Sequence, residues 1–243
     1  MTIYVGRREY QGSSFVEHVQ PNTTVVRCLS ASTEYGCLSP YCLTDENGFI
    51  MENIWQFGKI YEDVPAVSVP YSRWNKDIIW EYPAQRHIVD GMIRPEYWQW
   101  RDQGMRTKHP VRYPVGYHHR HKCRGYLQIL GTTVRNLDYI AARREVYVPL
   151  YRHCLSLATG TTKEKFQGLV DLVRQGQDLT IVEVDGPKSA LLGHYQKKYG
   201  VAPNFIVDNV MVATPENLEI MKSDDKSPYG HGYCLAECLL SEK

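Results

Sequence analysis

The chain has 243 residues, and its apolar fraction of 43% and charged fraction of 23% are ordinary for a globular protein. A formal net charge of +1 indicates no particular class of partner. No run approaches the roughly 18 consecutive apolar residues of a membrane helix, and residues 1–10 lack the apolar core of a signal peptide. We therefore expect a cytoplasmic protein with no membrane partner.

The seven cysteines include no C-x-x-C pair, which argues against a zinc ribbon or a thioredoxin-type site. We expect all seven to be reduced thiols. The histidines in the run at 118–121 have no Cys or Asp partners at a ligand spacing. The sequence therefore predicts no metal and no cofactor.

Hydrophobic spacing and turn residues predict the elements in chain order. We expect short strands at 2–6 and 24–29, helices at 51–61, 137–157 and 162–175, a buried strand at 179–184 and a C-terminal helix at 232–240. Because strands and helices do not alternate, the prediction is a mainly helical α+β fold in one domain, 1–243. The proline-broken stretch 65–133 is predicted to be an insertion.

The predicted helix at 51–61 (MENIWQFGKIY) has an unusual distribution of polar residues. At 100° per residue, its four residues Glu52, Trp55, Gln56 and Lys59 share an arc of about 100°. Apolar residues occupy most of the remaining surface, which favours a buried helix whose polar stripe faces a cavity. An acid and an amine in such a place perturb each other's pKa, as catalytic groups do. The alternative is a solvated stripe on a half-exposed helix.

Several segments resemble motifs of the NADAR (YbiA-like) family and occur in the family's order. The family's central E-H-Y-F-Q-A-Q-K-F helix is similar to 52–60 (ENIWQFGKI), where Asn53 replaces the histidine. The other similar segments are 35–41 (YGCLSPY), 155–159 (LSLAT), 179–185 (LTIVEVD) and 231–239 (HGYCLAECL).

The resemblance implies a hydrolase that cleaves an N-glycosidic bond. It would remove ADP-ribose from guanine in a nucleotide or nucleic acid, or act on a riboflavin-biosynthesis intermediate. The alternative is a non-catalytic module that binds ADP-ribose or nucleic acid. The presence of both Glu52 and Lys59 favours an enzyme, because binding alone does not need that pair.

N-glycoside cleavage needs an acid for the departing nitrogen and a group that stabilises or attacks the anomeric carbon. We assign these roles to Glu52 and Lys59. Asp185 is a candidate second carboxylate, or else the first residue of an Asp-Gly-Pro turn. The predicted substrate contacts are Gln56 for a sugar hydroxyl, Trp55 or Tyr41 for stacking on the base, and Ser39 from the 35–41 motif.

The stretch 86–125 holds nine Lys or Arg against three acids, interleaved with Tyr and Trp. Cations contact phosphates and aromatic rings stack on bases, so this composition suits single-stranded nucleic acid or a dinucleotide. Arg120, Lys122 and Arg124 are the predicted phosphate contacts. The alternative is a charged surface loop whose aromatic residues belong to the core.

Overall fold

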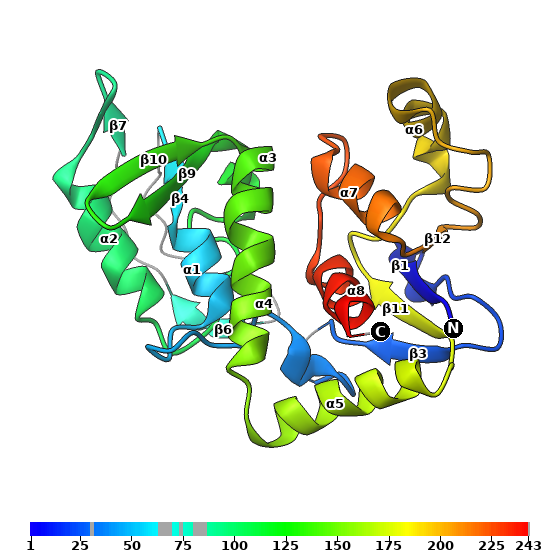
Figure 1. Cartoon of the computed structure of the whole chain (residues 1–243). Helices are drawn as coiled ribbons and strands as arrows, with labels where there is room; N and C mark the ends of the chain where they lie inside the picture. The colour runs from blue at the N-terminus through cyan, green and yellow to red at the C-terminus, as the bar shows by residue number, and fades with distance from the viewer. Residues whose placement is uncertain (30–31, 63–69, 73–74, 80–86, 243) are drawn as a thin grey trace. The chain divides into compact units, whose positions relative to one another are not determined.

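The computed structural model describes residues 1–29, 32–62, 70–72, 75–79 and 87–242. The chain forms two compact units, each described here by itself. Unit 1 comprises Met1–Leu43 and Ala158–Lys243, and unit 2 is Thr44–Leu157. Both contain helices and strands, so the α+β class predicted from the sequence is confirmed (Figure 1).

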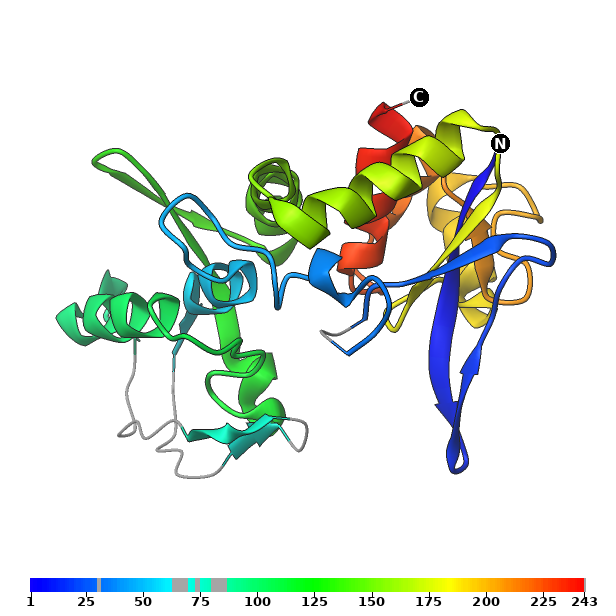
Figure 2. The same ribbon diagram turned by 90° about the horizontal axis from the view of Figure 1, so that it is seen from below.

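Unit 1 is built on a sheet with the strand order β12-β1-β11-β3. Its strands are β1 (Ile3–Gln11), β3 (Thr24–Arg27), β11 (Leu179–Glu183) and β12 (Val210–Val212). The central strand β11 runs parallel to both β1 and β3, and all five of its residues are buried. The strands predicted at 2–6, 24–29 and 179–184 are thereby confirmed. β1 continues to Gln11 because its second half forms a hairpin with β2 (Ser14–Glu17), visible in Figure 2.

The described part of unit 1 also contains four α-helices: α5 (Gly160–Arg174), α6 (Leu192–Tyr199), α7 (Pro215–Ser223) and α8 (His231–Ser241). The apolar helix α8 packs against β11 and β1 (Figure 1). The helices predicted at 162–175 and 232–240 are α5 and α8. No helix in the described ranges is both long and apolar enough to cross a membrane.

The carboxylate of Glu183 joins the end of β11 to the start of α8. One oxygen accepts the Gly232 N–H at 2.7 Å and the other accepts the Asp185 N–H at 3.1 Å. A side chain at Gly230 would collide with this carboxylate, so glycine is required for the close approach. His231 Nδ1 lies 3.8 Å from the carboxylate, and Nε2 donates to the Cys28 carbonyl at 2.7 Å. Although burial opposes it, the Glu183 charge raises the pKa of His231 from 6.5 to about 10.

This pair predicts a specific pH dependence of stability. Because the folded-state pKa is raised, the contribution of protonated His231 is complete below about pH 6.5 and is lost as the pH rises through about 10. Between pH 6.5 and 8.5 we expect the free energy of unfolding to fall relative to the His231→Gln variant, by at most about 1.4 kcal/mol per pH unit. Urea unfolding at three pH values measures the difference, and parallel profiles for the two proteins would contradict it.

Unit 2 contains a short helix, a three-stranded sheet and a long helical segment. The helix is α1 (Met51–Phe57), and the sheet has the order β10-β9-β4, with β4 (Lys59–Tyr61), β9 (Cys123–Leu130) and β10 (Thr133–Leu137). The helical segment predicted at 137–157 runs through α3 (Tyr139–Ala142), a π-helical turn η3 (Arg143–Tyr147) and α4 (Val148–Ser156). The unit also contains α2 (Pro95–Met105), the 3₁₀ helix η2 (Tyr117–Lys122) and the small hairpins β5 (Pro70–Ser72) with β6 (Asn75–Ile79) and β7 (Ile88–Val89) with β8 (Met92–Ile93).

The prediction of one helix over 51–61 is wrong at its C-terminal end. α1 stops at Phe57, and Lys59 begins a strand that pairs with β9. Gly58 makes the change possible, because the Tyr126 ring occupies the place that a Cβ would take. The pairing partners lie more than sixty residues further along the chain, beyond the reach of helical periodicity.

The stretch predicted as an insertion supplies much of the unit 2 core. Its residues 65–69, 73–74 and 80–86 lie outside the described residues. From the remainder, Tyr97 and Trp100 are buried among residues of α1 and β4, and Tyr97 donates to the carbonyls of Phe57 and Gly58. The cluster consists of Phe57, Ile60, Tyr61, Tyr97, Trp100, Val111, Val115 and Leu127. These two aromatic residues of the basic stretch are therefore core residues.

Candidate active site around Lys59

The polar side chains of α1 form a hydrogen-bonded chain that ends at an amine. Lys59 Nζ donates to Gln56 Oε1 at 2.8 Å, and Gln56 Nε2 donates to Glu52 Oε1 at 2.9 Å. Glu52 and Gln56 are buried, with 5% and 7% of their surface exposed, while Lys59 is half-buried. Glu52 and Gln56 are four residues apart, so their side chains are neighbours on the surface of α1. The turn at Gly58 then places the Lys59 side chain within hydrogen-bond distance of Gln56.

Aromatic rings surround the amine end of this chain. Lys59 Nζ lies 4.9 Å from the centre of the Trp55 ring, within the range of a cation–π contact. The Trp55 ring stacks on Tyr126 at 5.1 Å and meets Tyr147 at 4.9 Å. Trp55 is only 7% exposed, so most of its surface is used within the unit.

A cavity of about 260 Å³ opens beside Lys59 and Trp55. Glu52 is connected to it through Gln56 and Lys59. The lining combines two cationic side chains, one carboxylate, one thiol and three aromatic rings. The lining residues are Trp55, Lys59, Cys123, Arg124, Gly125, Tyr126, Asp138, Tyr139 and Ala142.

Opposing effects act on the Lys59 amine. Burial lowers its pKa below the ordinary value of 10.5, and the positive charge of Arg112 acts in the same direction. Cys123 and Glu52 oppose this shift. The net direction is downward, which increases the fraction of neutral, nucleophilic amine at a given pH.

Asn53, which replaces the histidine of the family motif, has a structural role. It is fully buried, and its Nδ2 donates to the carbonyls of Thr107 and His109, each at 2.9 Å. Its Oδ1 accepts the Val111 N–H at 2.7 Å. One amide thus ties the loop after α2 to the helix that carries Glu52 and Gln56.

Three of the residues predicted to form the site belong to unit 1. Ser39 is fully buried. Tyr41 and Asp185 are half-buried. The Asp185 N–H donates to Glu183, and its carbonyl accepts the Tyr233 hydroxyl at 3.5 Å. The structure brings Glu52, Trp55, Gln56 and Lys59 together in unit 2, and the roles of Ser39, Tyr41 and Asp185 stay predictions.

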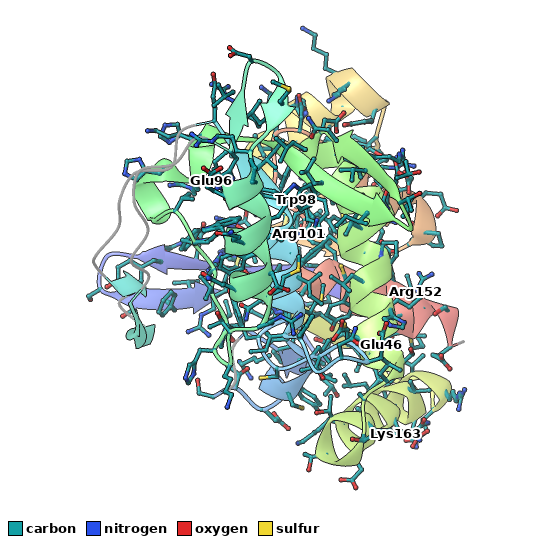
Figure 3. The ribbon with its side chains drawn as sticks, turned by 90° about the vertical axis from the view of Figure 1, so that its left-hand side faces the viewer. Glu46, Glu96, Trp98, Arg101, Arg152 and Lys163 are labelled. Carbon is teal, nitrogen blue, oxygen red and sulfur yellow. The ribbon has the colours of Figure 1, made fainter. Side chains whose placement is uncertain are left out.

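The three predicted phosphate contacts, Arg120, Lys122 and Arg124, lie in η2 and at the start of β9. Arg120 is exposed and Lys122 half-buried in η2. Arg124 lines the cavity beside Lys59, and its Nε lies 2.7 Å from Glu62 Oε2. Elsewhere in the basic stretch, Trp98 and Arg101 project from α2, with the guanidinium carbon 5.9 Å from the indole centre (Figure 3).

The described residues contain one group of metal-ligand type, in unit 1, formed by His194, Asp224 and Asp225. Its ligand atoms already bond to protein groups. His194 Nε2 bonds to Asp224 Oδ1 at 2.8 Å, and Lys198 Nζ donates to Asp225 at 2.9 Å. The buried Asp224 carboxylate also accepts the Ser227 N–H. This group therefore acts as a link between α6 and the segment that follows α7.

Sequence reasoning missed Asp138, Tyr139 and Cys123 as cavity residues. Asp138 accepts the Ala141 N–H at 2.8 Å as the N-cap of α3. Asp in front of a periodic apolar segment is a capping signal, so this residue could have been placed at a helix start. Nothing in the sequence indicates that β9 and α3 face Lys59.

Comparison of the chain with protein-family models, curated proteins and solved structures finds no match.

The contacts of Asn53 predict a large loss of stability when its amide is removed. The Asn53→Ala change leaves one N–H and two carbonyls without this partner, so we expect a loss of about 3 kcal/mol. Urea denaturation measures the loss. The control is Asn47→Ala, an exposed turn residue, for which we expect a change within about 0.5 kcal/mol. Equal stability of the two variants would contradict the role of Asn53.

Proposed function

We propose that the chain is an N-glycosidase that hydrolyses the bond between a ribose, or the ribose of ADP-ribose, and a base or amine. The supporting observation is the Lys59 amine, which lines an aromatic-walled cavity and is linked through Gln56 to the buried carboxyl group of Glu52. An amine whose pKa is lowered by burial is suited to attack an electrophilic carbon.

In the proposed mechanism, the neutral Lys59 amine attacks C1 of the ribose as the bond from C1 to the base nitrogen breaks. Glu52, which is connected to the cavity through Gln56 and Lys59, is the source of the proton that the leaving nitrogen receives, and it regains one from the alkylated Lys59 nitrogen. The sugar ring then opens to an imine at C1, and the remaining N–H proton passes to the ring oxygen. Water hydrolyses the imine, which frees Lys59 and releases the sugar.

Burial favours the protonation state that this mechanism requires. Glu52 and Lys59 can hold one proton between them either as carboxylate and ammonium or as carboxylic acid and amine. Burial lowers the pKa of Lys59 and favours its neutral amine, although the charge of Glu52 opposes this shift. The mechanism uses the pair of carboxylic acid and amine, because that pair contains both a proton donor and a nucleophile.

The size of the cavity limits what it can hold. At about 260 Å³ it is smaller than the roughly 300–1,000 Å³ of pockets for drug-sized ligands. We propose that the ribose and the bond to be broken lie inside, and that the remainder of an ADP-ribosylated nucleotide extends past Arg124 at the lining. We propose such a nucleotide, alone or in nucleic acid, as the substrate. The cationic side chains of η2 and β9, Arg120, Lys122 and Arg124, are candidates for contacts with its phosphates.

The assignment of Glu52 is tested by the Glu52→Gln change. Glutamine can still accept from Gln56 but cannot supply a proton, so turnover should fall by roughly 100-fold or more. The assay follows free ADP-ribose released from a guanine-ADP-ribosylated oligonucleotide. The control is Glu96→Gln in α2, where an exposed carboxylate pairs with Arg94 and no loss is expected.

Two outcomes would contradict the proposal in different ways. A loss below tenfold with unchanged stability would exclude Glu52 as the acid. If the wild-type protein binds ADP-ribose but releases no product from any N-glycoside, the chain is a non-catalytic binding module.

Salt dependence distinguishes a nucleic acid substrate from a free nucleotide. Each phosphate neutralised by a cation releases counterions, so affinity for an oligonucleotide should fall steeply with salt. Replacing Arg120 and Lys122 by alanine should flatten the log–log slope by about 0.7 for each contact removed from a single strand. Hydrolysis of a free ADP-ribosylated nucleoside should change little. The control replaces two exposed unit 1 lysines, Lys163 and Lys197, by alanine. Identical slopes for both double variants would contradict phosphate contacts by η2.

A further inference from the structure

Tyr139 stands out among the aromatic residues that line the cavity because its ring is open to solvent. It is 48% exposed, whereas Trp55 and Tyr126 are 7% and 3% exposed. Trp55 and Tyr126 stack on each other, so most of their ring surface is covered by protein atoms. Tyr139 therefore offers the largest accessible aromatic surface beside Lys59.

The position of the Tyr139 ring is fixed by its neighbours. Asp138 caps the helix that begins at Tyr139, which sets the direction of the first turn. One turn later, the guanidinium carbon of the buried Arg143 lies 4.9 Å from the centre of the Tyr139 ring. The Trp55 ring lies 6.3 Å away, and the Lys59 amine contacts the same indole. A half-exposed ring held in this way is pre-organised for stacking, since little side-chain entropy is lost on binding.

We propose that Tyr139 stacks on the leaving group and thereby selects N-glycosides whose leaving nitrogen belongs to a planar heteroaromatic ring over those that release an aliphatic amine. This inference rests on the proposed function of the same site. It also changes the assignment of the stacking residue, which sequence reasoning gave to Trp55 or Tyr41. Stacking of a base on an aromatic side chain contributes about 1–3 kcal/mol, whereas an aliphatic amine gains no such contact.

A binding experiment tests the stacking contact without requiring turnover. Guanosine is titrated into the wild-type protein, Tyr139→Phe and Tyr139→Leu, and the heat of binding is measured. The phenyl ring keeps the aromatic face, so Tyr139→Phe should bind within about threefold of wild type. Tyr139→Leu should bind roughly 5- to 150-fold more weakly, the range that corresponds to 1–3 kcal/mol. The matched control is Tyr10→Leu, a 60% exposed tyrosine of unit 1, for which no change is expected.

A kinetic experiment tests the selection of the leaving group. The wild type and Tyr139→Leu are compared on a purine riboside 5′-phosphate and on a ribosylamine 5′-phosphate that carries an alkyl group. We expect the ratio of kcat/KM for the two substrates to fall by about tenfold or more in Tyr139→Leu, mainly through the KM of the purine substrate. Thermal unfolding of each variant separates this effect from loss of the fold.

The outcomes separate this inference from the proposed function. If Tyr139→Leu binds guanosine as tightly as wild type, or keeps the wild-type ratio of kcat/KM, the role of Tyr139 is overturned even if the protein is an N-glycosidase. If guanosine binding depends on Tyr139 but no N-glycoside is cleaved, the stacking contact stands and the proposed catalytic function fails.

Discussion

Burying a polar side chain without a hydrogen bond is costly, and this cost determines the arrangement of unit 2 around α1. The helix has only seven residues and buries Glu52, Asn53 and Gln56 among apolar neighbours. Leaving any of these groups unpaired would cost about 1–3 kcal/mol or more. Asn53 is satisfied by the loop after α2, and Gln56 is satisfied on both sides by Glu52 and Lys59. The same bonds that satisfy the helix therefore position the amine.

The end of the helix is as important for the site as the helix itself. Because α1 stops at Phe57, the backbone of Lys59 pairs with Tyr126 of β9 rather than with the helix. This pairing adds the start of β9 to the cavity, including Arg124 and a tyrosine ring that stacks on Trp55. The close approach at Gly58 thus connects a local backbone change to the aromatic walls.

Sequence reasoning was most successful where one element carries its own signal. The apolar positions of α5 repeat at helical spacing, and β11 and α8 are continuous apolar segments, so their types and approximate bounds followed directly. The polar stripe of α1 was likewise visible. The cavity was not, because it depends on the pairing of β4 with β9 and on the placement of α3, which are long-range contacts. For the same reason the sequence left open whether the aromatic residues of the basic stretch, among them Tyr97 and Trp100, contact a ligand or belong to the core, where the structure places these two.

The motif resemblance is distributed over both units, and its parts have different physical meanings. In the 179–185 segment, both Glu183 oxygens accept backbone N–H groups and the carboxylate pairs with His231. Through these bonds the Glu183 carboxylate holds β11 to α8, so a structural role is sufficient to explain an acidic residue at position 183. Around Lys59, the polar groups bond to one another and the amine reaches a cavity. Packing does not require a lysine whose pKa is lowered by burial, because an apolar residue would fill the position at a lower desolvation cost. The activity that we propose is therefore best sought at Lys59, and the unit 1 motif segment is best understood as part of the fold.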